Sequence, residues 1–133
     1  MKIYTHSDKV GNKYGVGVVL IGDKEQEHMC QYIETDSINE VGSTLIGIKS
    51  ALSYVKANKL LYCKFDEVMI YNNLGNKNKG IIRNLKHNPT FKNLDYTIQS
   101  ISSECDKYRI SMCKSKVQVQ QRMYMAINYK QRY

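Results

Sequence analysis

The side chains that could bind a metal ion through sulfur or nitrogen are scattered along the chain. They are Cys30, Cys63, Cys105, Cys113, His6, His28 and His87. No two of them form a Cys-x-x-Cys pair or show the ligand spacing of a zinc finger. We therefore expect buried, reduced thiols and no zinc site. The sequence indicates no other cofactor.

The charge balance favours an anionic partner without identifying it. The chain has 20 Lys and Arg residues against 12 Asp and Glu residues, a formal net charge of +8. Such a charge raises affinity for every polyanion. Nucleic acid is therefore a candidate partner, although Lys-rich, Asn-rich and Tyr-rich usage is also what an AT-rich genome produces.

Length and hydropathy predict one intracellular domain. A chain of 133 residues can bury a real core, and we expect a single domain over residues 1–133. No run of about eighteen apolar residues predicts a membrane span. The first residues form a strand pattern instead of a charged and then apolar leader, so we expect no secretory signal and a cytoplasmic location.

The first half of the chain predicts three strands and a helix. Two β runs, at residues 2–8 and 14–20, flank a turn at residues 11–13 and predict a hairpin. A third strand is expected at residues 27–34. Apolar residues then recur at helical spacing, which predicts a helix from Ser43 to Ala57 that packs on the sheet.

The second half predicts a parallel strand and shorter elements. Phe65 to Tyr71 is a short apolar run after a helix, typical of a strand added through a crossover. Residues 75–80 predict a flexible polar loop, and residues 81–85 only a helical turn. The remaining expected elements are a helix at Asn93–Lys107, a strand at Tyr108–Lys114 and a helix at Val117–Tyr129.

This order of elements, together with the opening hairpin, resembles the ribonuclease H family. In that family the first strand ends Thr-Asp-Gly-Ser, and the matching stretch here is Thr5-His6-Ser7-Asp8. The resemblance covers nearly the whole chain. It implies an α/β, ribonuclease H-like fold with a mixed five-stranded sheet and flanking helices.

The resemblance also implies where catalytic carboxylates should stand. Enzymes of this family use four carboxylates to hold two divalent metal ions that act on a phosphodiester. The matching positions here are His6, Thr44 (or Gly42 with a two-residue shift), Asn73 and Met123 or a near neighbour. Because none is acidic, we expect no catalytic residues, no bound metal and a non-catalytic protein.

A displaced metal site is the alternative. Asp8, Glu40 and either Asp66 or Glu67 could form it if the fold brought them together, although they match the family's spacing poorly. Such a site would make the protein a divergent metal-dependent nuclease.

A basic surface is expected where the family places residues near its substrate. Lys114, Lys116 and Arg122 follow the predicted last strand, and Lys9 and Lys13 lie in the opening hairpin. These five cations are the candidates for phosphate contact; a solvated charged face explains them equally well. The leading hypothesis is a non-catalytic binding protein that contacts nucleic acid through this face.

A second hypothesis places a protein partner on the C-terminal region. Tyr124, Tyr129, Arg132 and Tyr133 are candidates for an interface, where aromatic and arginine side chains contribute disproportionately. Small size, AT-rich composition and the replaced catalytic positions also suit a phage- or mobile-element-encoded protein. Such a protein would bind and inhibit a host-defence protein such as a CRISPR nuclease.

Overall fold

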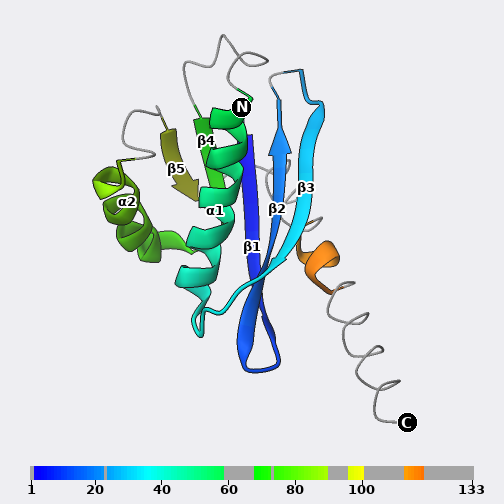
Figure 1. Ribbon diagram of the computed structural model, residues 1–133, viewed down its shortest axis with the longest axis vertical. Coiled ribbons are helices and arrows are strands. Elements are labelled where there is room, and N and C mark those ends of the chain that lie inside the picture. The colour runs from blue at the N-terminus through cyan, green and yellow to red at the C-terminus, as the bar shows by residue number, and fades with distance from the viewer. Residues whose placement is uncertain are drawn as a thin grey trace.

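The computed structural model describes residues 2–22, 24–58, 68–72, 74–89, 96–100 and 113–118. The strands are β1 (Lys2–Val10), β2 (Lys13–Ile21), β3 (Glu27–Glu34), β4 (Val68–Asn72) and β5 (Tyr96–Ser100). They form one mixed sheet in the order β3-β2-β1-β4-β5 (Figure 1). The β1–β2 and β2–β3 pairs are antiparallel, whereas the β1–β4 and β4–β5 pairs are parallel.

The predicted opening hairpin is confirmed. Pairing runs from Lys2 opposite Ile21 to Val10 opposite Lys13, which leaves Gly11 and Asn12 as the two-residue turn. Gly11 has a φ of 63°, a conformation that favours glycine and that tight hairpin turns use. Glycine at this position therefore sets the register of the two longest strands.

Helix α1 (Glu40–Ala57) begins three residues before the predicted start at Ser43. The side-chain oxygen of Asn39 accepts a hydrogen bond from the backbone N–H of Gly42 at 2.7 Å, so Asn39 caps the helix and lets it begin at Glu40. No helix among the described residues is long and apolar enough to cross a membrane.

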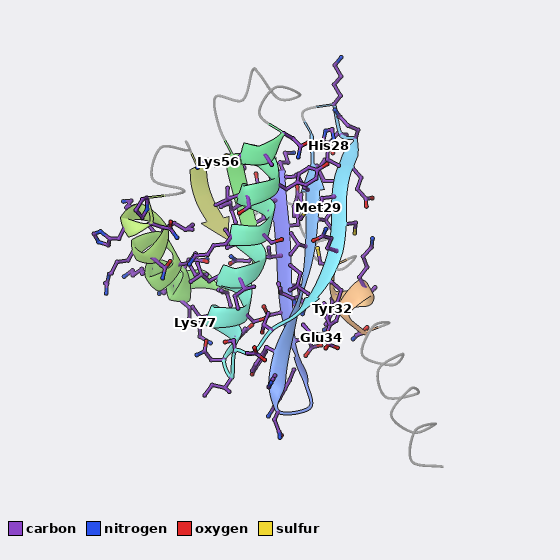
Figure 2. The ribbon with its side chains drawn as sticks, in the orientation of Figure 1. His28, Met29, Tyr32, Glu34, Lys56 and Lys77 are labelled. Atoms are coloured by element: carbon purple, nitrogen blue, oxygen red, sulfur yellow. The ribbon has the colours of Figure 1, made fainter. Side chains whose placement is uncertain are left out.

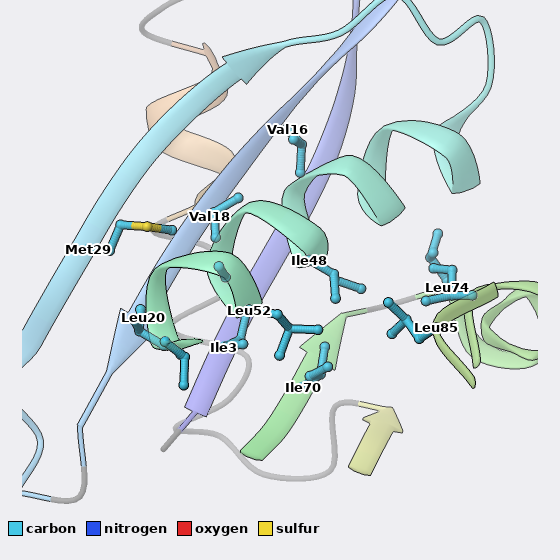
Figure 3. Close-up of a cluster of buried hydrophobic side chains, with 13 residues drawn as sticks. Ile3, Val16, Val18, Leu20, Met29, Ile48, Leu52, Ile70, Leu74 and Leu85 are labelled. Carbon is cyan, nitrogen blue, oxygen red and sulfur yellow. The ribbon is translucent and has the colours of Figure 1, made fainter. Parts of the chain in front are cut away.

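The sheet buries side chains on both faces. On one face, α1 and the following helices cover the larger core (Figures 1 and 3). This core includes Ile3, Val18, Leu52, Ile70 and Leu85, all fully buried. The opposite face holds a smaller cluster of Tyr4, Val19, Ile21, Tyr71 and Cys113.

Alternation along β1 explains the two cores. Ile3 points into the larger core and its neighbour Tyr4 into the smaller one, as successive strand residues must. The rings of Tyr4 and Tyr71 stack with centroids 5.0 Å apart, which ties β1 to β4 on the second face.

The helix predicted at Asn93–Lys107 is wrong at its centre, where β5 lies. Leu94, Ile98 and Ile101 have helical spacing, yet Tyr96 to Ser100 pairs with Val68 to Asn72 of β4 in parallel. This strand has only five residues, and so short an apolar pattern does not distinguish a strand from a helical turn.

Two further predictions also change. The polar stretch after β4 is the 3₁₀ helix η1 (Gly75–Lys77), which continues directly into α2 (Asn78–His87), not a flexible loop followed by one turn. The strand predicted at Tyr108–Lys114 is wrong at its end, because residues 113–118 are helical. Residues 108–112 and most of the predicted final helix lie outside the described residues.

We predict that Gly47 is required where α1 crosses β2. A Cβ atom on Gly47 would lie 2.8 Å from a methyl carbon of Val16 and 3.0 Å from one of Val18. Gly47→Val should therefore lower the free energy of unfolding by about 1–3 kcal/mol, measured by urea denaturation.

The matched control is Gly80→Ala in α2, where an added Cβ meets nothing within 4 Å. This change should stabilise the protein by up to about 1 kcal/mol, because alanine is the better helix former. A Gly47→Val protein as stable as the wild type would contradict the close packing of α1 on β2.

Candidate functional site at the carboxyl ends of β1 and β4

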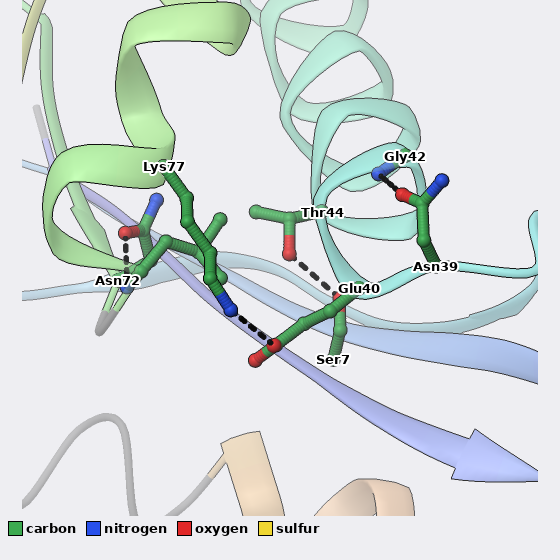
Figure 4. A network of polar contacts seen from close by, with 8 residues as sticks. Ser7, Asn39, Glu40, Gly42, Thr44, Asn72 and Lys77 are labelled. Carbon is green, nitrogen blue, oxygen red and sulfur yellow. Dashed lines mark hydrogen bonds and ion pairs between the residues drawn. The ribbon is translucent and has the colours of Figure 1, made fainter.

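Polar side chains gather where the parallel strands β1 and β4 end. Tyr4 of β1 lies opposite Tyr71 of β4, so Asn72 ends β4 beside the part of β1 that continues to His6 and Asp8. The first turns of α1 and the start of α2 meet the same edge (Figure 4). The carboxyl ends of parallel strands are a common place for binding sites.

Ser7 and Thr44 join β1 to α1. Their hydroxyl oxygens lie 2.7 Å apart, and both residues are buried. Thr44 is the position where the family resemblance expects the second carboxylate. Here that position is neutral, and its hydroxyl already has a hydrogen-bond partner.

Asn72 and Asn78 join the end of β4 to the start of α2. Each side-chain amide donates to the oxygen of the other at 2.9 Å, and the Asn72 oxygen also accepts the backbone N–H of Leu74 at 3.0 Å. Both residues are buried, at 1% and 6% exposure. The pair therefore orients the chain just before Asn73, the third expected carboxylate position, which lies outside the described residues.

Glu40 is the acidic residue in the first turn of α1. Its carboxylate lies 3.8 Å from the ammonium group of Lys77 on η1, an ion pair that links the starts of two helices (Figure 4). Asp8 accepts the backbone N–H of Lys9 at 2.8 Å. These interactions partly satisfy both carboxylates without a metal ion.

His6 is the position at which the family resemblance expects the first metal-binding carboxylate. Its Nδ1 atom is buried and has no hydrogen-bond partner among the described residues. Burial lowers the pKa of His6 below its ordinary value; the charge of Lys114 acts in the same direction, whereas Asp8 and Glu40 oppose it. The imidazole is therefore neutral at pH 7.

The geometry limits the chemistry available at this edge. Hard divalent ions such as Mg²⁺ prefer negatively charged oxygen ligands, but the buried positions hold hydroxyls, amides and a neutral imidazole. Within the described part of the chain, no three His, Cys, Asp or Glu side chains come together as a possible metal site. Asp66 and Glu67, named for a displaced site, lie outside it.

Four of the five predicted phosphate-contacting cations are described, and their surroundings differ. Lys13 pairs with Asp36 at 2.9 Å, and Lys116 contacts Cys30 and lies 3.9 Å from Glu27. Lys9 and Lys114 are exposed. Nearby carboxylates therefore offset two of these cations, while Lys114 is near enough to His6 for its charge to affect that pKa.

The other predicted positions lie outside the described residues. They are Arg122, Met123, Tyr124, Tyr129, Arg132 and Tyr133. The proposed protein interface and the fourth carboxylate position therefore stay predictions.

Two features of the structure were not predicted from the sequence. The Asn72–Asn78 amide pair has no distinctive spacing, and only the turn through η1 brings its members together. The second feature is a pair of cations, Lys49 on α1 and Arg83 on α2. The sequence could have indicated this pair, because the chain has only two acidic residues between Glu40 and Asp95, namely Asp66 and Glu67.

Comparison with protein-family models finds no match, and comparison with curated proteins also finds none. Two similar solved structures are both described as RNase H1. The enzyme from the halophilic archaeon Halobacterium salinarum NRC-1 aligns with a TM-score of 0.52 at 13% identity, covering 80% of this chain and 88% of that one. LC11-RNase H1, isolated from compost by a metagenomic approach, aligns with a TM-score of 0.58 at 16% identity, covering 90% and 96%.

At such low sequence identity the comparisons show a similar backbone fold and do not show whether this chain catalyses any reaction. In this chain the described strands have the order β3-β2-β1-β4-β5, and helices lie on both sides of the sheet. The chain therefore has an α/β fold of the ribonuclease H-like type.

Proposed function

We propose that this protein is a non-catalytic, ribonuclease H-like protein that binds nucleic acid. The observation that carries the proposal is the mutual pairing of polar groups at the carboxyl ends of β1 and β4. Ser7 pairs with Thr44, and Asn72 pairs with Asn78. Neutral groups thus satisfy one another where a two-metal nuclease needs converging negative charge.

The electrostatics of the site support the same proposal. Two divalent cations at close range repel each other strongly, so they need several carboxylates to hold them. Glu40 is already paired with Lys77, and a neutral His6 replaces the first acid. Loss of hydrolysis does not require loss of binding, because phosphate contacts depend on cations and hydrogen-bond donors instead of metal ligands.

The charge of the whole chain supports binding of a polyanion. A net charge of +8 attracts nucleic acid from a distance and speeds encounter. The fold is that of solved structures described as RNase H1, which makes a nucleic-acid strand the natural partner class to test.

We predict no metal-dependent cleavage. Purified protein with Mg²⁺ or Mn²⁺ should leave an RNA/DNA hybrid, single-stranded RNA and single-stranded DNA intact. The reason is that, among the described residues, the edge offers only the carboxylates of Asp8 and Glu40, too few for two ions. Gel assays with labelled substrates measure this. Cleavage that disappears in Asp8→Ala or Glu40→Ala would instead establish the displaced metal site.

We also predict steeply salt-dependent binding. On duplex DNA the logarithm of the affinity should fall with the logarithm of salt concentration, with a slope of about −0.9 per contacted phosphate. Lys114→Ala should make that slope shallower by about one unit if Lys114 contacts a phosphate, measured by fluorescence anisotropy.

Lys116→Ala is the matched control for Lys114→Ala. It lies two residues away and removes the same charge, but Lys116 is already engaged by Glu27 and Cys30. It should therefore change the slope less. Equal slopes for wild type and Lys114→Ala would remove Lys114 from the binding surface.

A further inference from the structure

A hollow lies between α1 and α2, away from the edge described above. Its volume is about 630 Å³. Lys49 contributes from the middle of α1, and the other lining residues come from α2 and the turn after it: Gly80, Arg83, Asn84, His87, Asn88 and Pro89. Figure 2 labels Lys77 near the start of α2 and Lys56 in the last turn of α1.

The spacing on α2 gives this hollow a polar wall. Gly80, Arg83, Asn84 and His87 recur at the intervals that place side chains on one face of a helix. Ile81 and Leu85 lie between them in sequence and are fully buried in the core. Gly80 has no side chain to fill the hollow, and a Cβ added there would meet nothing within 4 Å.

The charged residues that line the hollow, Lys49 and Arg83, are positive, and the two helices supply no acidic residue beside them. Neither α2 nor the part of α1 after Glu40 contains an acidic residue. The ion pairs found in the described part of the chain employ Lys2, Lys13, Lys77 and Lys116. Lys49 and Arg83 belong to none of these pairs, so their charges remain available to a ligand.

The lining groups suit phosphate better than other ligands. Arg83 presents a planar fork of N–H donors that matches phosphate oxygens, Lys49 adds a compact positive charge, and Asn84 adds an amide. Among the described residues, the lining includes no carboxylate for a metal ion. The exposed cation Lys79 extends the positive surface along α2, as a polymer of phosphates would require and a single phosphate would not.

We propose that the α1–α2 hollow is a phosphate-binding site for a nucleic-acid backbone, with Lys49 and Arg83 as its main contacts. The inference rests on the proposed function and deepens it by assigning the contact to the helical face. The described cations that were predicted from the sequence do not line this hollow; they are Lys9, Lys13, Lys114 and Lys116.

The test compares five variants of the full chain, of which three are single changes to alanine. Lys49→Ala and Arg83→Ala each remove a charge from the hollow, and Lys86→Ala removes one from the same helix outside it. Anisotropy titrations with duplex DNA and with single-stranded RNA and DNA give the affinity at several salt concentrations. Thermal melting of each variant confirms that it is folded.

We expect Lys49→Ala and Arg83→Ala each to make the log–log salt slope on duplex DNA shallower by about 0.9, corresponding to one lost phosphate contact. The double variant should lose about twice as much, whereas Lys86→Ala should change the slope less than either. Arg83→Glu should weaken binding further than Arg83→Ala, because it places a like charge beside the phosphate.

The outcomes separate this inference from the proposed function. If the wild type binds but the hollow variants behave like Lys86→Ala, the phosphate site is wrong and the proposed function stands. If the wild type binds none of the nucleic acids even at low salt, both are wrong.

Discussion

Parallel pairing of β1 with β4 is the constraint on which the rest of the structure depends. Two parallel strands cannot be joined by a tight turn, so the chain must cross over one face of the sheet, and α1 lies within that connection. The pairing buries Ile3 against Ile70 on one face and stacks Tyr4 on Tyr71 on the other. It also brings the ends of both strands to one edge, beside the start of α1.

That edge illustrates a balance between stability and catalysis. Carboxylates gathered in a partly buried site repel one another and resist desolvation unless metal ions neutralise them. Ser7 with Thr44, and Asn72 with Asn78, avoid this cost because each of these four side chains has a neutral partner. Each pair also connects two elements, so polar groups at the edge contribute to the fold.

The parts of the fold that could be predicted are those with strong local signals. Gly11 marks the hairpin turn, and the apolar stripe of α1 is long enough to separate a helix from a strand. The strand Tyr96–Ser100 lacked such a signal, because five residues of parallel strand and one helical turn look alike in sequence. The residues of the candidate site also differ in how far the sequence could predict them. His6 and Thr44 could be located by aligning whole elements, but the partners Ser7, Asn78 and Lys77 depend on distances that only the folded chain determines.

Charge shows most clearly why position matters more than composition. The net charge of the chain attracts polyanions to the whole molecule, yet a cation beside a carboxylate must give up part of that interaction to bind phosphate. Lys13, Lys77 and Lys116 each have a carboxylate within 4 Å. Lys49 and Arg83 lie on helices from which acids are absent beyond Glu40, so no acidic residue of these helices competes with a phosphate there. The number of lysines does not distinguish cations that have a carboxylate partner from those that have none in the described part of the chain. The distribution of acidic residues along the chain does. The acid-poor stretch between Glu40 and Asp95 includes both helices that line the α1–α2 hollow, which is why the phosphate site is proposed there.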